Sequence, residues 1–161
     1  MLKKKEDQSS VKLNPNEFVL SDSLKEITCL YEIRRNIGLE LSMANVCQQI
    51  FKHLLPAMKY PDHASAVIEI DGIRIASKNH DHNLTHALKS RINVNGKTCG
   101  QLSVFYSGNN PFLQLEEQRL IDAIASDLAR WLERKQVDEI LRERLKEITC
   151  LYEIRRGMGL E

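Results

Sequence analysis

Apolar residues change their spacing along the chain, and each spacing predicts a different kind of element. Between residues 24 and 37 they recur every three or four positions, which is typical of a helix with an apolar side. Ser23 followed by Glu26 resembles a capping box, so we expect the helix to begin there, and Gly38 ends the pattern. The more polar residues before Ser23 show no period. The sequence therefore predicts a mobile leading segment followed by a helix.

A second helix and two β-hairpins follow. Ser42 supplies an N-cap and Pro56 a stop for the second helix. After it the spacing becomes alternate, and Asp71-Gly72 and Asn95-Gly96 have the composition of tight hairpin turns. The polar stretch 77–85 between the hairpins is expected to be a loop or a short helix. The four expected strands are 64–70, 73–76, 90–94 and 97–107.

The last pattern is helical and runs without a break from about Leu115 to Tyr152, more than 35 residues. Such a length is far above that of an ordinary globular helix. We expect Trp131 to be buried on the sheet-facing side of this helix, beside Leu128 and Leu132. The order of elements predicts an α+β fold: a central antiparallel sheet, helices packed on it, and long helices at both ends.

Part of the first helix is repeated in the last one. Residues Leu24–Glu40 and Leu145–Glu161 agree at 15 of 17 positions across an offset of 121 residues, and the twelve residues from Leu24 to Arg35 recur unchanged from Leu145 to Arg156. Solenoid repeats are only about 20–50 residues long. The repeat instead suits whole domains laid end to end, with the start of a second unit at the end of this chain.

These patterns divide the chain into four parts, which are a disordered leading segment, a linker helix, a domain of helices and sheet, and a coiled-coil linker helix (1–22, 23–40, 41–135 and 136–161). Beyond Lys135 nothing in the domain is left to cover the apolar stripe, whose heptad spacing is typical of a parallel coiled coil. We therefore expect a homodimer through the helical ends. The candidate dimer residues are Leu24, Ile27, Tyr31, Leu141, Leu145, Ile148 and Tyr152.

Composition excludes some classes of partner. The net charge is only +1, from 23 basic and 22 acidic side chains, and no basic patch is interleaved with aromatic residues. A nucleic-acid partner is therefore not expected. No run of about 18 apolar residues and no signal-peptide pattern occurs, so we expect a cytoplasmic chain with no membrane-spanning segment.

Few residues suggest chemistry. The four cysteines are widely spaced, which favours free thiols, and Cys99 is the first candidate for a reactive one. His80, His82 and His86 could meet around a divalent ion if their loop folded back, but their spacing matches no standard site. A solvated polar loop is the favoured interpretation. We therefore predict no metal site and no catalytic residue, and no cofactor is identified.

The segment Asn93–Val104, with its strand, turn and G-x-L-x-V strand, is similar to a segment of the GAF domain, a small-ligand sensor module related to PAS domains. Phe112–Arg134 resembles the closing helix of a bacterial GAF domain. The resemblance covers residues 41–135 and implies an antiparallel sheet with helices packed on its face. It also implies dimerisation through linker helices, as in sensor histidine kinases and cyclases, with output domains C-terminal to the sensor.

The resemblance implies that the 79–86 region lines a ligand cavity, so the candidate pocket residues are His80, His82, His86 and Cys99. The cyclic-nucleotide signature and a bilin-attaching Cys-His pair are both missing. We expect a sensory domain of a signal-transduction protein that binds a small ligand. The alternatives are a ligand-free GAF-shaped scaffold for dimerisation and spacing, or a redox enzyme that uses thiols on a GAF fold.

Overall fold

The computed structural model describes residues 15–84, 86–108 and 114–158 and has an α+β fold. The predicted order of two helices, two hairpins and a final helix is confirmed, although β3 begins before the expected Ser90. Two short 3₁₀ helices, η1 and η2, were not predicted. The elements are α1 (Pro15–Asn36), α2 (Met43–Leu54), η1 (Leu55–Ala57), η2 (Pro61–His63), β1 (Ala64–Ile70), β2 (Ile73–Ala76), β3 (Ala87–Val94), β4 (Lys97–Tyr106) and α3 (Gln114–Gly157).

The sheet has four antiparallel strands in the order β2-β1-β4-β3. Asp71 and Gly72 have φ angles of 51° and 80°, and Asn95 and Gly96 have 52° and 77°. Two successive positive φ angles define a type I′ turn, which suits the twist of a hairpin. Both predicted turns are therefore confirmed. Local signals do not specify that β4 inserts between β1 and β3, because that pairing joins strands distant in the sequence.

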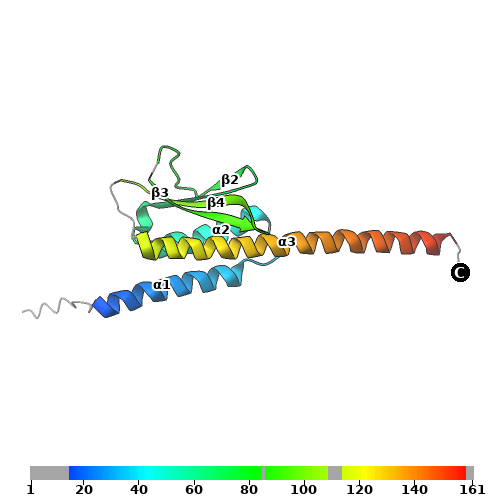
Figure 1. The fold of residues 1–161 in the computed structure, drawn as a ribbon, viewed down its shortest axis with the longest axis horizontal. Helices are drawn as coiled ribbons and strands as arrows, with labels where there is room; N and C mark the ends of the chain where they lie inside the picture. The colour runs from blue at the N-terminus through cyan, green and yellow to red at the C-terminus, as the bar shows by residue number, and fades with distance from the viewer. Residues whose placement is uncertain (1–14, 85, 109–113, 159–161) are drawn as a thin grey trace, which may run out of the picture.

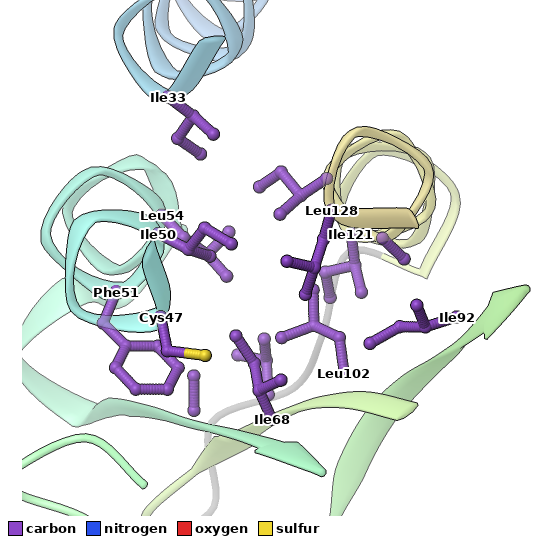
Figure 2. Close-up of a cluster of buried hydrophobic side chains, with 14 of the residues drawn as sticks. Ile33, Cys47, Ile50, Phe51, Leu54, Ile68, Ile92, Leu102, Ile121 and Leu128 are labelled. Carbon is purple, nitrogen blue, oxygen red and sulfur yellow. The ribbon is translucent and has the colours of Figure 1, made fainter. Parts of the chain in front are cut away.

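The helices cover one face of this sheet in two layers (Figure 1). The helix α2 and the first half of α3 lie on the sheet, and α1 lies on the outer side of these two helices. Figure 2 shows Ile33 of α1 pointing between α2 and α3, toward Ile50, Leu54 and Leu128. The main hydrophobic core therefore has three tiers: sheet, helix pair and α1.

Close packing inside the sheet depends on Gly100 of β4. A Cβ atom at this position would overlap the carbonyl oxygen of Glu69 and lie 3.0 Å from the Cα of Ile70. No real Cβ tolerates such a contact with backbone atoms. Glycine therefore lets β4 approach β1 where the two central strands pair.

The first helix begins earlier than expected. Residues 15–22 belong to α1, so the prediction of a disordered segment over 1–22 is wrong for them, and Ser23 is not an N-cap. A capping box is only a local preference, and Pro15 at the first position of the helix has a φ suited to starting one. The part of this prediction that concerns residues 1–14 lies outside the described residues.

The second helix begins as predicted. The Ser42 side chain accepts a hydrogen bond from the backbone N–H of Asn45 at 3.3 Å, which caps the helix. One side of α2 is buried against the sheet and the other helices. Its buried residues are Val46, Cys47, Ile50, Phe51 and Leu54.

The helix α3 is 44 residues long and divides into two halves. Leu120, Ile124 and Leu128 in its first half are at most 3% exposed, and Trp131 is only 4% exposed, which confirms its predicted burial. All side chains from 139 to 158 are exposed. The second half therefore extends beyond the domain without contacting it (Figure 1).

Candidate functional site

The sheet face that the helices leave uncovered carries a shallow groove. Strand alternation points Val67, Ser103 and Phe105 to this face, away from the main core. The groove has a volume of about 140 Å³. Ligand pockets usually have volumes of about 300–1,000 Å³, so this groove is small for a metabolite. The residues around it are Val67, Glu69, Arg74, Lys89, Gln101, Ser103 and Phe105.

The loop after β2 covers one end of this face and is tied to β1. The Ser77 hydroxyl accepts a hydrogen bond from the Ala66 N–H at 3.0 Å, and the Asn79 side-chain amide donates to the Ala64 carbonyl at 2.9 Å. The backbone N–H of Ser77 also donates to the Ala66 carbonyl at 2.8 Å, so backbone and side-chain bonds together extend the strand pairing beyond β2. They fix the position of the next residue, His80.

His80 packs as part of the fold. Its Nδ1 lies 3.1 Å from the Ser65 hydroxyl, and its ring lies 4.8 Å from the ring of Phe105. Partial burial lowers the pKa of His80, and the nearby His82 and Arg74 lower it further. The neutral imidazole is therefore the form that suits this position.

The other two histidines of the predicted pocket do not complete a ligand set with His80. His82 is exposed and meets the ring of His80 edge-on, with ring centres 5.3 Å apart, and His86 is also exposed. Within residues 15–84, 86–108 and 114–158, no group of three or more His, Cys, Asp or Glu side chains is arranged to hold a metal ion.

Cys99 lies away from the histidines. It is six residues from Phe105 along β4, or roughly 20 Å in an extended strand, and it packs against the main core, where its thiol donates to the Ile92 carbonyl at 3.5 Å. Burial and the neighbouring Asp71 raise its pKa. The prediction that Cys99 shares one pocket with His80 is therefore wrong, because the two lie at opposite ends and on opposite sides of the sheet.

The remaining thiols divide into two buried and one exposed. Burial raises the pKa values of Cys29 and Cys47 to about 12 each. Both thiols are therefore protonated at neutral pH, and a thiol is a poor nucleophile. Cys150 is exposed, although it is the same position of the repeated segment as the buried Cys29. Nothing at Cys29 or Cys47 favours thiol chemistry.

Two apolar faces run along α1. Each helical residue turns about 100° from the last, which places Leu24, Ile27 and Tyr31 on one side of the helix. They are 62%, 63% and 60% exposed. Cys29 and Ile33 lie on the opposite side and are 4% and 0% exposed, packed between α2 and α3. The predicted dimer residues of α1 therefore lie on the face that the domain does not use.

The second half of α3 presents the same predicted seam to solvent. Leu141, Leu145, Ile148 and Tyr152 are 61–65% exposed and follow a heptad spacing. Single exposed apolar residues are ordinary, but a continuous apolar stripe along a helix usually marks a surface that binds another helix. This stripe and the outer face of α1 form the strongest candidate for a functional surface.

Polar contacts fix the end of α1 to α3. The buried carboxylate of Asp127 accepts from Arg34 Nε at 2.8 Å and also pairs with Arg130. The Trp131 indole N–H donates to the Gly38 carbonyl at 2.9 Å, and Lys135 donates to the Leu39 carbonyl. Movement of α1 relative to α3 would have to break these bonds.

Larger hollows lie on both sides of α1, each with a volume of about 430 Å³. One lies between α1 and α2, and its lining includes Leu24, Glu32 and Lys52. The other lies beside α3, where Arg34, Arg130 and Arg134 surround Asp127 and Trp131. Their shapes depend directly on how α1 packs.

The sequence was compared with known proteins. No protein-family model matches it, and a search of curated proteins finds no similar sequence. Among the described residues, no helix is both long and apolar enough to cross a membrane.

Proposed function

We propose that this chain is a GAF-like sensory module of a signal-transduction protein, which dimerises through its helical ends and relays a change of packing along α3. The observation that carries the proposal is the exposed seam of Leu141, Leu145, Ile148 and Tyr152 on a helix that continues beyond its domain. Output domains, such as those of a histidine kinase, would follow α3 in a longer protein.

Dimerisation follows from the energy of covering the seam. Fully burying a Leu or Ile side chain is worth about 1.5–3 kcal/mol, whereas an exposed ion pair contributes about 0–1 kcal/mol. A parallel partner helix would cover Leu141, Leu145 and Ile148 at once. Hydrophobic pairing should therefore dominate, and salt should weaken the dimer only slightly.

The relay would act at the contact between α1 and α3. A small ligand that prefers one packing of these helices shifts the population toward that packing, by no more than its difference in affinity for the two. The ion pair from Arg34 to Asp127 connects the two helices, and the bond from Trp131 to Gly38 connects α3 to the loop after α1. A change at this contact would rotate or shift the coil that leaves the domain.

A second candidate is a scaffold that dimerises and spaces other domains without binding a ligand. The small groove of about 140 Å³ on the open sheet face favours it, because Phe105 and His80 already fill part of that face. Thermal shifts against a panel of nucleotides, metal ions and metabolites separate the two candidates. A ligand at 100 times its dissociation constant adds about 2.7 kcal/mol of stability, and the scaffold shows no such shift.

Sedimentation tests the dimer directly. We expect the wild-type chain to be a dimer at tens of micromolar, and the triple variant Leu141→Glu, Leu145→Glu, Ile148→Glu to be a monomer with an intact sheet domain. The matched control changes Glu143, Lys146 and Glu147, which lie off the seam, to Ala, and should remain a dimer. A concentration-independent monomer mass for the wild type would contradict the proposal.

A further inference from the structure

The repeated segment carries a second apolar face that only α1 uses. By sequence identity, Cys150, Leu151 and Ile154 in α3 correspond to Cys29, Leu30 and Ile33 in α1. In α1 these three side chains are buried or half-buried against the core. In α3, Leu151 and Ile154 are 62% and 51% exposed. Ile154 lies on the side of the helix opposite Leu145, and Leu151 lies between that side and the seam. A coiled-coil partner on the seam would leave this second face open.

The surface that fits this face is already visible in the structure. Figure 2 shows Ile33 seated between α2 and α3, toward Ile50, Leu54 and Leu128. Beside it, Arg34 pairs with the buried Asp127 at 2.8 Å. Residues 145–156 repeat residues 24–35 without a change, so they can make the same set of contacts, with Ile154 in the place of Ile33 and Arg155 in the place of Arg34.

We propose that residues 145–156 are a docking segment for the α2–α3 groove of a second copy of this domain. The contact uses Cys150, Leu151, Ile154 and Arg155, and it leaves Leu145, Ile148 and Tyr152 free for the coiled coil. The inference rests on the proposed function only in treating α3 as a linker helix. Its central residues Cys150 and Ile154 lie opposite the dimer seam, whereas Arg155 borders the seam beside Ile148. A change at Ile154 therefore tests the docking contact without altering a seam residue.

The wild-type chain keeps its own groove filled. Its α1 is tethered to the domain and competes at an effective concentration of roughly millimolar, which an identical segment from another chain does not match at micromolar concentration. The groove becomes available only when its own α1 is weakened or missing. Docking then joins the end of one chain to the groove of the next, a head-to-tail contact that produces open assemblies.

The test uses the full-length chain with Ile33→Asp, which should release α1 from the groove. In sedimentation we expect assemblies larger than the wild type that grow with concentration. The matched double variant Ile33→Asp, Ile154→Asp should lose them, and Ile154→Asp alone should behave as the wild type. Docking should also bury Cys150, so its labelling by a maleimide should slow at least several-fold as the concentration of the Ile33→Asp chain rises. Assemblies that persist in the double variant, or a folded Ile33→Asp chain that forms none, overturn the proposal.

If Ile33→Asp does not keep a folded sheet domain by circular dichroism, the milder variant Ile33→Ala serves with a synthetic peptide of residues 145–156. The peptide should raise the thermal midpoint of Ile33→Ala by several degrees and that of the wild type by less than one degree. A peptide with Ile154→Asp should have no effect, whereas one with Leu145, Ile148 and Tyr152 changed to Ser should still act. No shift with the unchanged peptide, or a loss of effect on changing the seam residues, overturns the proposal and leaves the dimer untouched.

Discussion

The same twelve residues occur twice in this molecule in opposite surroundings. In α1, Ile33 is 0% exposed and anchors the helix to the domain, whereas its equivalent in α3, Ile154, is 51% exposed. Both copies are helical. The difference teaches that the sequence of the segment determines its helical state and its two apolar faces. The surrounding chain determines which of those faces is covered.

The exposed copy has local sources of stability that do not depend on a core. It continues a helix that is already formed in the domain, so no new nucleation is required. In the turn before the copy, Arg142 pairs with Asp138 at 3.0 Å, and such pairs add a few tenths of a kcal/mol each to the helix. The helix can therefore extend beyond the domain and present its apolar faces to other chains.

The largest loss of stability is expected on changing Trp131, whose side chain is hydrogen-bonded to the loop that follows the first copy. Trp131→Ala removes a side chain that is 4% exposed and its hydrogen bond to Gly38. We expect a loss of about 3–5 kcal/mol in the free energy of unfolding, measured by urea titration. A loss below about 1 kcal/mol, or a solvent-like emission maximum for this sole tryptophan in the wild type, would contradict its role as an anchor.

The sharpest comparison makes one change in each copy. Ile33→Ala should lower the free energy of unfolding by about 2–5 kcal/mol, because it leaves a cavity between α2 and α3. Ile154→Ala should change it by no more than about 0.5 kcal/mol, because its side chain is exposed. Both are measured by urea unfolding at one protein concentration. Equal effects of the two changes would show that the copies are not in different surroundings.

The equivalent arginines of the two copies, Arg34 and Arg155, should also contribute differently to stability, but by a smaller amount. Arg34→Ala breaks one of two contacts to the buried carboxylate of Asp127, and Arg130 remains as the other. Because Arg34 is itself more than half exposed, we expect a loss of about 1 kcal/mol or less. Arg155→Ala should leave the free energy of unfolding unchanged within measurement error. An effect of Arg34→Ala that is unchanged in 1 M salt would argue against an ion pair.

The smallest effect is expected far from both copies, at His80. Its folded pKa lies below the ordinary value of about 6.5, so the unfolded chain binds more protons in that range. The stability that depends on neutral His80 is therefore complete above about pH 6.5 and is lost as the pH falls through the folded pKa. His80→Gln should flatten the dependence of unfolding free energy on pH between 7 and 5. If the pH dependence of the unfolding free energy is the same in His80→Gln, groups other than His80 cause it.

Local sequence was sufficient to predict most of the secondary structure, because each signal acts over a few residues. Ser42 capped α2, and Asp71-Gly72 and Asn95-Gly96 formed the hairpin turns as expected. The same signals failed where a stronger neighbour overrode them. The capping box at Ser23 does not begin a helix, because Ser23 lies inside α1, which begins at Pro15.

The candidate site was only partly predictable. Heptad spacing identified the seam of Leu141 and Leu145, and the structure leaves those side chains exposed. The expected pocket of His80 and Cys99 was not recovered, because His80 packs on Phe105 at the open face of the sheet, whereas Cys99 packs against the main core. No sequence signal indicated that Asp127 would be buried against Arg34, since that contact joins residues 93 positions apart.

The sequence by itself determined the helices, the hairpin turns, and the fact that one helix segment is present twice with two apolar faces. Only the tertiary structure decided that β4 lies beside β1, that Gly100 permits this approach, and that Ile33 is the residue that fills the space between α2 and α3. The physical reason is that helix and turn preferences arise from neighbouring residues, whereas burial is a property of surfaces that distant parts of the chain bring together. Two identical segments can therefore have one structure and two surroundings.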